Sequence, residues 1–501
     1  MPGLNASLNI ALSGLQAQQA ALNVVGHNIA NVNTPGYTRE VANITSGKAF
    51  VEGDVYYGSG ANVTSVQGIR DRFLNLQITQ ETAKQAGAQT RYTTVNAVST
   101  TLGDTGTTGV SAQLQAFFQS FQDLAARPED TSLQTNVVGK AQNLVSTLQT
   151  QYQGLDDQRS NADQAVGSLV GQINTLTSQI ALLNQSISTA PSADTNNDAI
   201  DQRQALTDKL AGLVGINVVQ GSRGELQITL DSGAAVLVSG SSSYDLVTKR
   251  TGSGSDNYLQ VASNMAGSVV DVTSNIKDGQ LGANLDLRDN ILVGFQAQLD
   301  QIAAGLASKV NLGQKAGFAQ NGLAGVDFFQ NASVANRVSD GLPISIAVTP
   351  AVKSGSGWTD FYEGMVNLLS VNSALVADPS LIAAGGSAAA GDNANALAMA
   401  QLGSANNTVD TGTGSGTIGF TGAIGALITD LGTQTQNYSA QNTTQQNLLS
   451  ALQTQRDSLS GVNLDEEASN LMTLQRGYQA SARFLSVINS LADQLMTQLG
   501  R

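Results

Sequence analysis

Matching heptads of apolar residues at both ends of this 501-residue chain are the feature that most constrains its fold. Near the N-terminus, the heptad positions are Leu8, Leu15, Leu22 and Ile29. Near the C-terminus, one track runs through Leu464, Leu471, Tyr478, Leu485 and Leu499, and a second runs through Leu474, Ile488 and Leu495. Apolar residues at this spacing form a stripe along a helix that needs a partner. The pattern predicts terminal helices that pack together, or against other subunits, as coiled coils.

Charge and composition exclude several classes of protein. The net charge is −14, which disfavours nucleic acid as a partner because phosphate binding requires clusters of Lys and Arg. No segment approaches the roughly 20 consecutive apolar residues of a membrane span, and we expect no cleaved signal peptide. Cysteine is absent, so disulfides and Cys metal sites are excluded. We therefore expect neither a nucleic-acid partner nor membrane insertion.

The periodicity of the remaining chain predicts a mainly α protein with β-rich insertions, an α+β fold. Helical patterns cover residues 6–32, much of 70–213, 284–316 and the chain from 423 onward, with a break at 460–463. Within 166–187 the apolar spacing alternates between three and four, as in coiled coils. Short strands are expected in 37–70 and 215–275, and also at GLPISIAVTP (341–350) and MVNLLSV (365–371).

These patterns suggest three structural regions. The first is a terminal coiled-coil region of residues 1–36 and 462–501. The second is a helical-bundle domain of residues 37–214, 276–320 and 397–461. The third consists of outer β-rich or mixed insertions at 215–275 and 321–396.

Two short motifs lie beside the terminal heptads. The first is NIANVNTPGYTRE at 28–40, whose main residues are Asn28, Asn31, Asn33, Pro35, Gly36 and Tyr37. The second is GVNLDEE at 461–467, made of Gly461, Val462, Asn463, Leu464, Asp465, Glu466 and Glu467. Asn and Pro-Gly are typical of helix ends and turns. The acidic run suits a helix start, and the spacing of Asn463 and Glu466 fits a capping box. A further hypothesis is that Glu466 or Glu467 bonds a neighbouring subunit.

Together, the two motifs resemble the terminal signatures of the flagellar axial family of rod, hook and hook-associated proteins. SGVNLDEEASNL (460–471) is most similar to the hook-associated members that form the junction between hook and filament. Internal segments are similar to the same members. They are DQRQALTDKLAGLVGINV (201–218), LGANLDLRDNIL (281–292), QKAGFAQNGLAGVDFF (314–329) and GDNANALAMAQL (391–402). The resemblance therefore runs in order along nearly the whole chain.

The resemblance implies a structural subunit of the bacterial flagellum, exported through the flagellar type III channel and needed for flagellum assembly and motility. The implied partners are the hook protein, a second hook-associated junction protein, further copies of this chain, and an export chaperone that grips the C-terminal helix. The implied fold places both terminal helices in an inner tube. Because a monomer cannot bury all of the apolar stripe, we expect its ends to be partly disordered before assembly.

Other functions remain as alternatives. A hook or distal rod subunit would share the N-terminal motif, and a free coiled-coil adaptor would share the heptads. A surface enzyme on a flagellar scaffold is the remote alternative. His27 is the only histidine, and a lone histidine near a helix end is more often structural than catalytic. The GxGxxG match at 414–419 lacks the strand and helix that a dinucleotide site requires. We therefore expect no enzyme activity, cofactor or metal.

Overall fold

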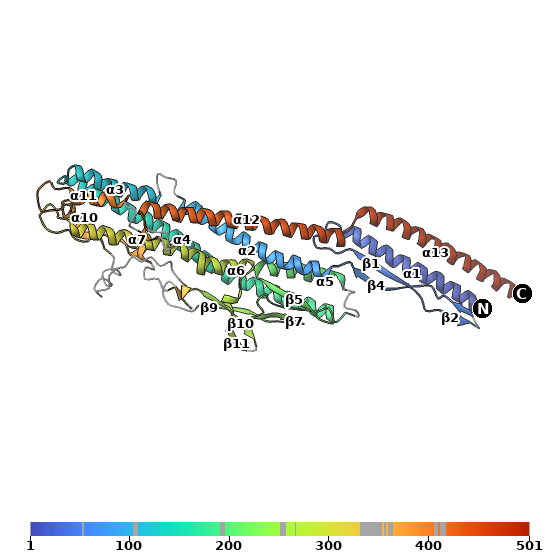
Figure 1. The fold of residues 1–501 in the computed structure, drawn as a ribbon. Helices are drawn as coiled ribbons and strands as arrows, with labels where there is room; N and C mark the ends of the chain where they lie inside the picture. The colour runs from blue at the N-terminus through green and yellow to red at the C-terminus, as the bar shows by residue number, and fades with distance from the viewer. Residues whose placement is uncertain are drawn as a thin grey trace. The chain divides into compact units, whose positions relative to one another are not determined.

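The computed structural model describes residues 2–52, 55–103, 109–190, 196–250, 257–265, 267–330, 353–354, 357–358, 364–404, 409–410 and 417–499. Long helices and small antiparallel sheets make up the structure, so the predicted class, mainly α with β-rich insertions, is confirmed (Figure 1). The chain divides into two compact units. Unit 1 contains Met1–Gly87, Gly167–Gly282 and Thr443–Arg501, and unit 2 contains Ala88–Val166 and Ala283–Asn442. The three regions expected from the sequence remain a prediction.

The long α-helices follow the predicted segments. The α-helices are α1 (Pro2–Asn31), α2 (Arg72–Leu102), α3 (Val110–Ala126), α4 (Thr131–Ser188), α5 (Asn197–Leu213), α6 (Gly279–Asp286), α7 (Leu292–Ala316), α9 (Met365–Leu368), α10 (Ser373–Ala377), α11 (Ala394–Leu402), α12 (Phe420–Ser460) and α13 (Leu464–Leu499). The short helices α9, α10 and α11 were not predicted. Short 3-10 turns cover Thr273–Asn275 and Pro379–Leu381, and a π-helical turn covers Leu287–Ile291. The predicted break between the last two helices is confirmed.

In unit 1, α1 and α13 pack side by side (Figure 1). A Cβ built on Gly14 would lie 3.5 Å from Ser481 Oγ, and one built on Gly477 would lie 3.0 Å from Gln18 Cδ. The numbers rise along one helix as they fall along the other, so the two helices are antiparallel. At both glycines the nearest atoms of the opposite helix belong to side chains, those of Ser481 and Gln18.

The described residues of unit 1 also form four small antiparallel sheets. β1 (Glu40–Ser46) pairs with β4 (Ala61–Gly68), and β2 (Phe50–Glu52) pairs with β3 (Val55–Tyr57). A four-stranded sheet contains β5 (Ile216–Gln220), β6 (Leu226–Leu230), β7 (Val236–Ser239) and β8 (Ser242–Ser243). A three-stranded sheet contains β9 (Leu246–Arg250), β10 (Leu259–Met265) and β11 (Ser268–Asp271). The strands predicted within 37–70 and 215–275 are therefore confirmed.

The part of α4 that belongs to unit 1 combines an apolar stripe with buried amides. Ile173, Ile180 and Ile187 recur every seven residues and are fully buried. Asn184 bonds three backbone groups at distances of 2.8–3.0 Å, the N–H and C=O of Leu226 and the C=O of Gly240. Asn174 pairs in the same way with both backbone groups of Leu246. The stripe supplies apolar burial, and the two amides satisfy strand ends that would otherwise lack partners.

Unit 2 is built around aromatic side chains. Phe117, Phe121 and Phe328 are fully buried, with ring centroids 5.3–5.9 Å apart. Where unit 2 is described, its strands form three short pairs: β12 (Phe329–Gln330) with β15 (Ser370–Val371), β13 (Lys353–Ser354) with β14 (Gly357–Trp358), and β16 (Val409–Asp410) with β17 (Thr417–Ile418). In the π-helical turn, buried Arg288 pairs with buried Asp163 at 2.8 Å.

One predicted strand is partly wrong. Within MVNLLSV, Met365–Leu368 forms the short helix α9, and only Ser370–Val371 pairs as a strand. The apolar run suits either structure, and two backbone N–H groups select the helical turn: those of Gly364 and Val366 donate to the carboxylate of Asp300, each at 2.9 Å. The predicted strand at 341–350 lies outside the described residues.

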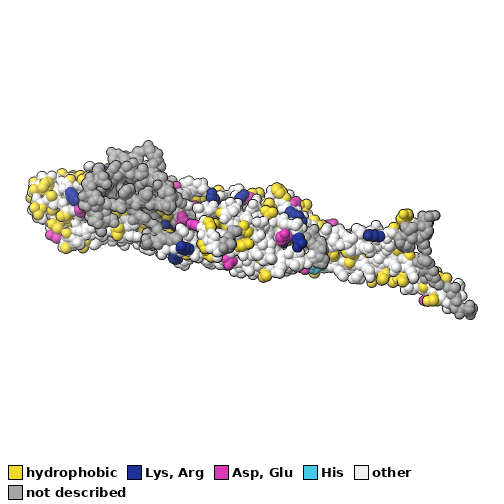
Figure 2. Space-filling model, turned by 90° about the horizontal axis from the view of Figure 1, so that it is seen from below, with side chains coloured by type: hydrophobic (Ala, Val, Ile, Leu, Met, Phe, Trp, Pro, Cys, Tyr) yellow, Lys and Arg dark blue, Asp and Glu magenta, His cyan; other side chains and the backbone are white. Residues whose placement is uncertain are grey.

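The described surface is mostly uncharged. On the face shown in Figure 2, Lys, Arg, Asp and Glu side chains are sparse among polar and apolar ones. No helix in the described part of the chain is both long enough and apolar enough to cross a membrane. Uncharged polar helix surfaces remain available for contacts with other proteins.

Candidate assembly site

The N-terminal motif forms a compact turn whose centre is Asn28. This side chain is 1% exposed. Its Oδ1 accepts hydrogen bonds from the Glu40 N–H and the Tyr37 hydroxyl, each at 2.9 Å, and its Nδ2 donates to the Glu40 carbonyl oxygen at 2.9 Å. One amide therefore joins the end of α1 to the first residue of β1, across the Pro-Gly turn.

The other motif residues form the turn itself. Asn31 Nδ2 donates to the His27 carbonyl oxygen at 3.1 Å, and its backbone oxygen accepts from the Thr34 N–H at 2.9 Å. Gly36 has φ of 82°, a left-handed conformation that glycine adopts without steric cost. Asn33 and Pro35 are exposed on the turn. The expected roles of Asn, Pro and Gly as helix-end and turn residues therefore agree with the geometry.

Tyr37 lies in a negatively charged environment. Burial raises the pKa of the Tyr37 phenol above its ordinary range, and the charges of Glu40, Asp198 and Asp201 raise it further. The phenol stays protonated at physiological pH, so it is available as the donor to Asn28.

The C-terminal motif starts α13. Asn463 Oδ1 accepts from the N–H of Asp465 at 3.0 Å and from that of Glu466 at 3.4 Å, which makes Asn463 the helix cap. The predicted capping box is wrong in its second half. The Glu466 carboxylate makes two hydrogen bonds with Arg39 instead, at 2.9 and 3.0 Å. An arginine fork provides two charge-assisted bonds, which outweigh a single bond to the cap backbone.

Arg39 thus joins the two motifs. Its backbone N–H donates to the Ser460 carbonyl oxygen at 2.8 Å, at the end of α12. Its Nε lies 2.9 Å from Glu467 Oε1, and the Glu467 side chain is only 2% exposed. This contact is an ion pair without hydrogen-bond geometry, because Arg39 Nε makes no hydrogen bond in the described structure. The second carboxylate oxygen, Glu467 Oε2, also lacks a hydrogen bond there. Gly461 and Val462 form the short link between α12 and α13.

A third element, α5, anchors the same turn. Both the N–H and the hydroxyl of Thr38 donate to the Asp201 carboxylate at 2.8 Å. Arg70 Nε and Nη2 donate to the same carboxylate at 3.1 and 2.7 Å. Asn197 accepts from the Gly68 N–H and donates to the Val66 carbonyl oxygen, each at 3.2 Å. Start and end of the β1–β4 hairpin are therefore both tied to α5.

The sequence interpretation missed Arg39, Arg70, Asn197 and Asp201 as members of this site. Arg39 and Asp201 lie inside segments that carry the family resemblance, at 28–40 and 201–218. No spacing rule connects them, because their contacts join positions more than 100 residues apart. Their position inside these two segments was the sequence signal for Arg39 and Asp201.

The predicted seam residues are only partly covered. Ile488 is fully buried, Leu8, Leu15, Leu22, Ile29, Leu471, Leu474 and Leu485 are half-buried, and Leu464, Tyr478 and Leu495 are exposed. The side chain of Leu499 lies outside the described residues. The buried apolar residues of α1 are smaller ones, Ala11, Ala17, Ala21, Val24 and Val25. A single chain therefore leaves much of the heptad stripe accessible.

A possible metal-ligand set also occurs here. His27, Glu40 and Asp198 place donor atoms within 4.8 Å of one another. His27 Nδ1 lies 3.2 Å from Glu40 Oε2 and 3.3 Å from the Tyr37 hydroxyl, which are ordinary hydrogen-bond distances. Asp198 is exposed. Hydrogen bonding within the turn accounts for the arrangement, so we assign no metal to it.

Comparisons with known proteins agree with the position of these motifs. Family models match at both ends: residues 8–38 match the flagella basal body rod protein, and 453–499 match the C-terminal part of the flagellar basal body rod FlgEFG proteins. Both ends therefore have the features of flagellar axial proteins. Between them, residues 95–329 match the helical domain of the flagellar hook-associated protein FlgK.

Relatives that match nearly the full chain identify one family among the flagellar axial proteins. Flagellar hook-associated protein 1 of Escherichia coli K12 is 30% identical over 98% of this chain and 100% of the relative. The proteins of the same name from Salmonella typhimurium LT2 and Bacillus subtilis 168 are 29% and 26% identical, each over 98% of this chain. This chain belongs to the flagellar hook-associated protein 1 family.

A solved structure supports the fold. The flagellar hook junction protein FlgK from Burkholderia pseudomallei has a TM-score of 0.64 and 20% identity, with 77% of this chain and 100% of that chain covered. At this identity the similarity concerns the fold alone.

Proposed function

We propose that this protein is a structural subunit of the bacterial flagellum that forms the junction between hook and filament by helical self-assembly. The observation that carries the proposal is the joining of two terminal motifs through Arg39, in a chain related to hook-associated protein 1 along its full length. The joined motifs give a stable base from which α1 and α13 extend as a pair. We assign this base a structural role, not a catalytic one.

Labelling in the assembled flagellum tests this assignment. A short epitope tag inserted after residue 253, in the segment between β9 and β10, would be located by immunogold microscopy on intact flagella of a strain that lacks the untagged protein. We expect gold only at the hook–filament boundary, and filaments restored by the tagged protein. Label along the hook or in the rod would identify the alternative, a hook or distal rod subunit. Restored filaments with no label at the boundary would contradict the proposal.

We further propose that the terminal helices become fully ordered only in the assembly. The exposed apolar side chains of α13 include Met472, Phe484, Val487, Leu491 and Leu495, which a coiled coil with neighbouring subunits would cover. Each apolar side chain buried would contribute about 1.5–3 kcal/mol. Limited proteolysis should therefore remove the first 30 or so and the last 40 or so residues from the monomer, and not from the assembly. Protection of both ends in the monomer would contradict this expectation.

The exposed surface of α13 suggests one partner, and the family relationship suggests two more. We propose that an export chaperone covers this surface before secretion by helix-in-groove recognition, and that the hook protein and a second hook-associated junction protein contact the assembled ring. Ile488 is buried inside the chain, so Phe484, Leu491 and Leu495 are the better chaperone test. Their triple replacement by Ser should abolish binding of the flagellar export chaperone, and Leu182→Ser, at an exposed leucine of α4, should not. Unchanged affinity of the triple variant would exclude this surface.

A further inference from the structure

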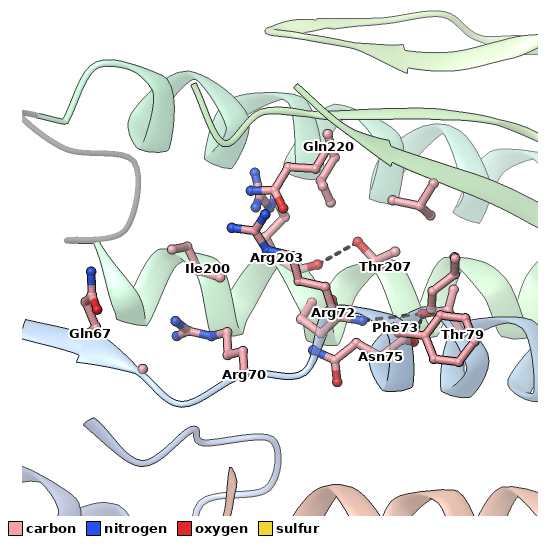
Figure 3. A pocket seen from close by; sticks show the side chains of 15 residues that line it. Gln67, Arg70, Arg72, Phe73, Asn75, Thr79, Ile200, Arg203, Thr207 and Gln220 are labelled. Carbon is pink, nitrogen blue, oxygen red and sulfur yellow. Dashed lines mark hydrogen bonds between the residues drawn. The ribbon is translucent and has the colours of Figure 1, made fainter. Parts of the chain in front are cut away.

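A pocket with a volume of about 450 Å3 lies within unit 1, apart from the seam of the terminal helices (Figure 3). Its walls come from the end of β4, the start of α2, one face of α5 and the strands β5 and β6. This volume is in the range of small-molecule sites. Three of the lining residues are arginines, Arg70, Arg72 and Arg203, although the chain as a whole carries a net charge of −14.

Arg203 is the unusual member of this group because it is only 3% exposed. Its Nη1 donates to Asn184 Oδ1 at 2.8 Å and to the Gly224 carbonyl oxygen at 2.7 Å. Among the described residues, no carboxylate lies within ion-pair distance of its guanidinium. Nε and Nη2 make no hydrogen bond to the described residues. Arg203 lines the pocket, so these two donors are the ones left for a ligand there.

The electrostatic environment disfavours a lone positive charge at this position. Burial and the nearby charge of Arg70 lower the pKa of Arg203 to about 10, and the charge of Glu225, which forms no ion pair with Arg203, opposes this effect only in part. The guanidinium still carries its charge at neutral pH. Asp201 neutralises Arg70 and does not form an ion pair with Arg203. A buried cation without a direct counterion is costly, and an anion placed against it removes that cost.

Apolar side chains also contribute to the lining of the pocket. Phe73, Leu76, Ile200 and Val218 line it, and the Phe73 side chain is 69% exposed. Gln67 and Gln220 provide neutral polar groups at the wall (Figure 3). The site thus combines guanidinium donors with an accessible aromatic ring. A ligand with one anionic end and one apolar end fits that combination.

We propose that this pocket binds an organic carboxylate, whose anionic group pairs with Arg203 and whose apolar part packs against Phe73. A planar carboxylate matches the geometry of the guanidinium fork, which favours it as the anionic group. The carboxylate is supplied either by a free small acid or by an acidic side chain of a second copy of this chain. The site does not depend on the proposed flagellar function.

Binding of 4-fluorobenzoate to the full chain, followed by 19F NMR, tests the proposal directly. We expect saturable binding, and no binding of 4-fluorobenzyl alcohol, which has the same ring without the charge. Arg203→Gln should weaken the binding roughly tenfold or more, because a charge-assisted pair is lost. Arg223→Gln is the matched control. This substitution removes the same charge, at an exposed residue that does not line the pocket. The Arg223→Gln variant should bind 4-fluorobenzoate with the affinity of the wild type.

Two additional measurements make the result unambiguous. Because Arg203→Gln also removes two buried hydrogen bonds, Arg72→Gln at the exposed rim is a second variant, and circular dichroism verifies the folding of both. Sedimentation at high protein concentration distinguishes the two sources of the carboxylate, a free small acid and an acidic side chain of a second copy of this chain. Self-association that 4-fluorobenzoate and Arg203→Gln both reduce identifies a second copy as the donor, and unchanged sedimentation identifies a free acid. Absence of millimolar binding, or equal binding by the alcohol, would overturn the proposal.

Discussion

The backbone N–H of Arg39 donates a 2.8 Å hydrogen bond to the carbonyl oxygen of Ser460, between the segment that follows α1 and the last residue of α12. The Arg39 guanidinium continues this link into α13 through Glu466 and Glu467. One residue therefore holds the first and last helical segments of unit 1 in one local structure. The following predictions test how that structure is stabilised.

The Arg39 pairs should contribute unequally. Arg39→Gln leaves the buried Glu467 carboxylate without a partner, so the opening free energy of the start of α13 should fall by about 3 kcal/mol. Glu466→Gln should lower it by less than about 1 kcal/mol, because the Glu466 side chain is 53% exposed. Amide hydrogen exchange of residues 464–474 in the assembled protein, where the terminal helices are expected to be ordered, measures both changes. Equal effects of the two substitutions would show that the buried pair is not the dominant one.

Asn28 should be the most sensitive residue of the N-terminal motif. Asn28→Ala removes three hydrogen bonds and leaves buried backbone groups of Glu40 without this partner, so local stability should fall by about 2–4 kcal/mol. Hydrogen exchange of amides 37–41 would report the change. Asn33→Ala is the control, because Asn33 is exposed on the same turn, and it should change stability by less than about 0.5 kcal/mol. A comparable loss in both variants would contradict the central role of Asn28.

Gly461 should not tolerate a side chain. A Cβ at this position would overlap the carbonyl oxygen of Asp457, so the link between α12 and α13 would have to move. Gly461→Ala should destabilise the link by about 1–3 kcal/mol and reduce filament formation in cells. The control is Gly432→Ala in α12, where no atom lies within 4 Å, and it should be neutral or stabilising by up to about 1 kcal/mol. Normal filaments with stable Gly461→Ala protein would be the contrary result.

Asp208 should make stability depend on pH. Burial raises the pKa of Asp208 above its ordinary value of 3.8, and the hydrogen bonds from Thr79 and Gln204 only partly oppose this effect. The folded protein then retains a proton that the unfolded chain has released, so stability falls as pH rises from 3.8 through the raised pKa and levels off above it. Asp208→Asn removes this loss.

The difference between the two proteins provides the measurement. Urea midpoints of wild type and Asp208→Asn, followed by circular dichroism from about pH 3.5 to about pH 7, should diverge in favour of the variant as pH rises. The divergence should stop above the folded pKa. Parallel pH profiles would show that Asp208 ionises as readily in the folded protein as in the unfolded chain.

The sequence alone predicted those parts of the protein whose cause is local. Hydrophobic spacing located α1, α5, α7 and α13, and alternation located the strands of 37–70 and 215–275, because both signals depend on near neighbours in the chain. The Asn and Pro-Gly signals placed the turn after α1 for the same reason. MVNLLSV was partly misassigned since its short apolar run suits helix and strand alike, and distant Asp300 decides between them.

Only the tertiary structure decided which residues meet. The heptads predicted that the terminal helices need partners, yet the buried apolar residues of α1 are smaller ones, and much of the heptad stripe remains accessible. The spacing of Glu466 fits a local capping box, but its carboxylate instead accepts hydrogen bonds from Arg39, which is distant in the chain. Asp201 and Arg203, two residues apart, face a strand start and a pocket respectively. Such choices depend on long-range geometry and the cost of burying charge, which sequence spacing does not encode.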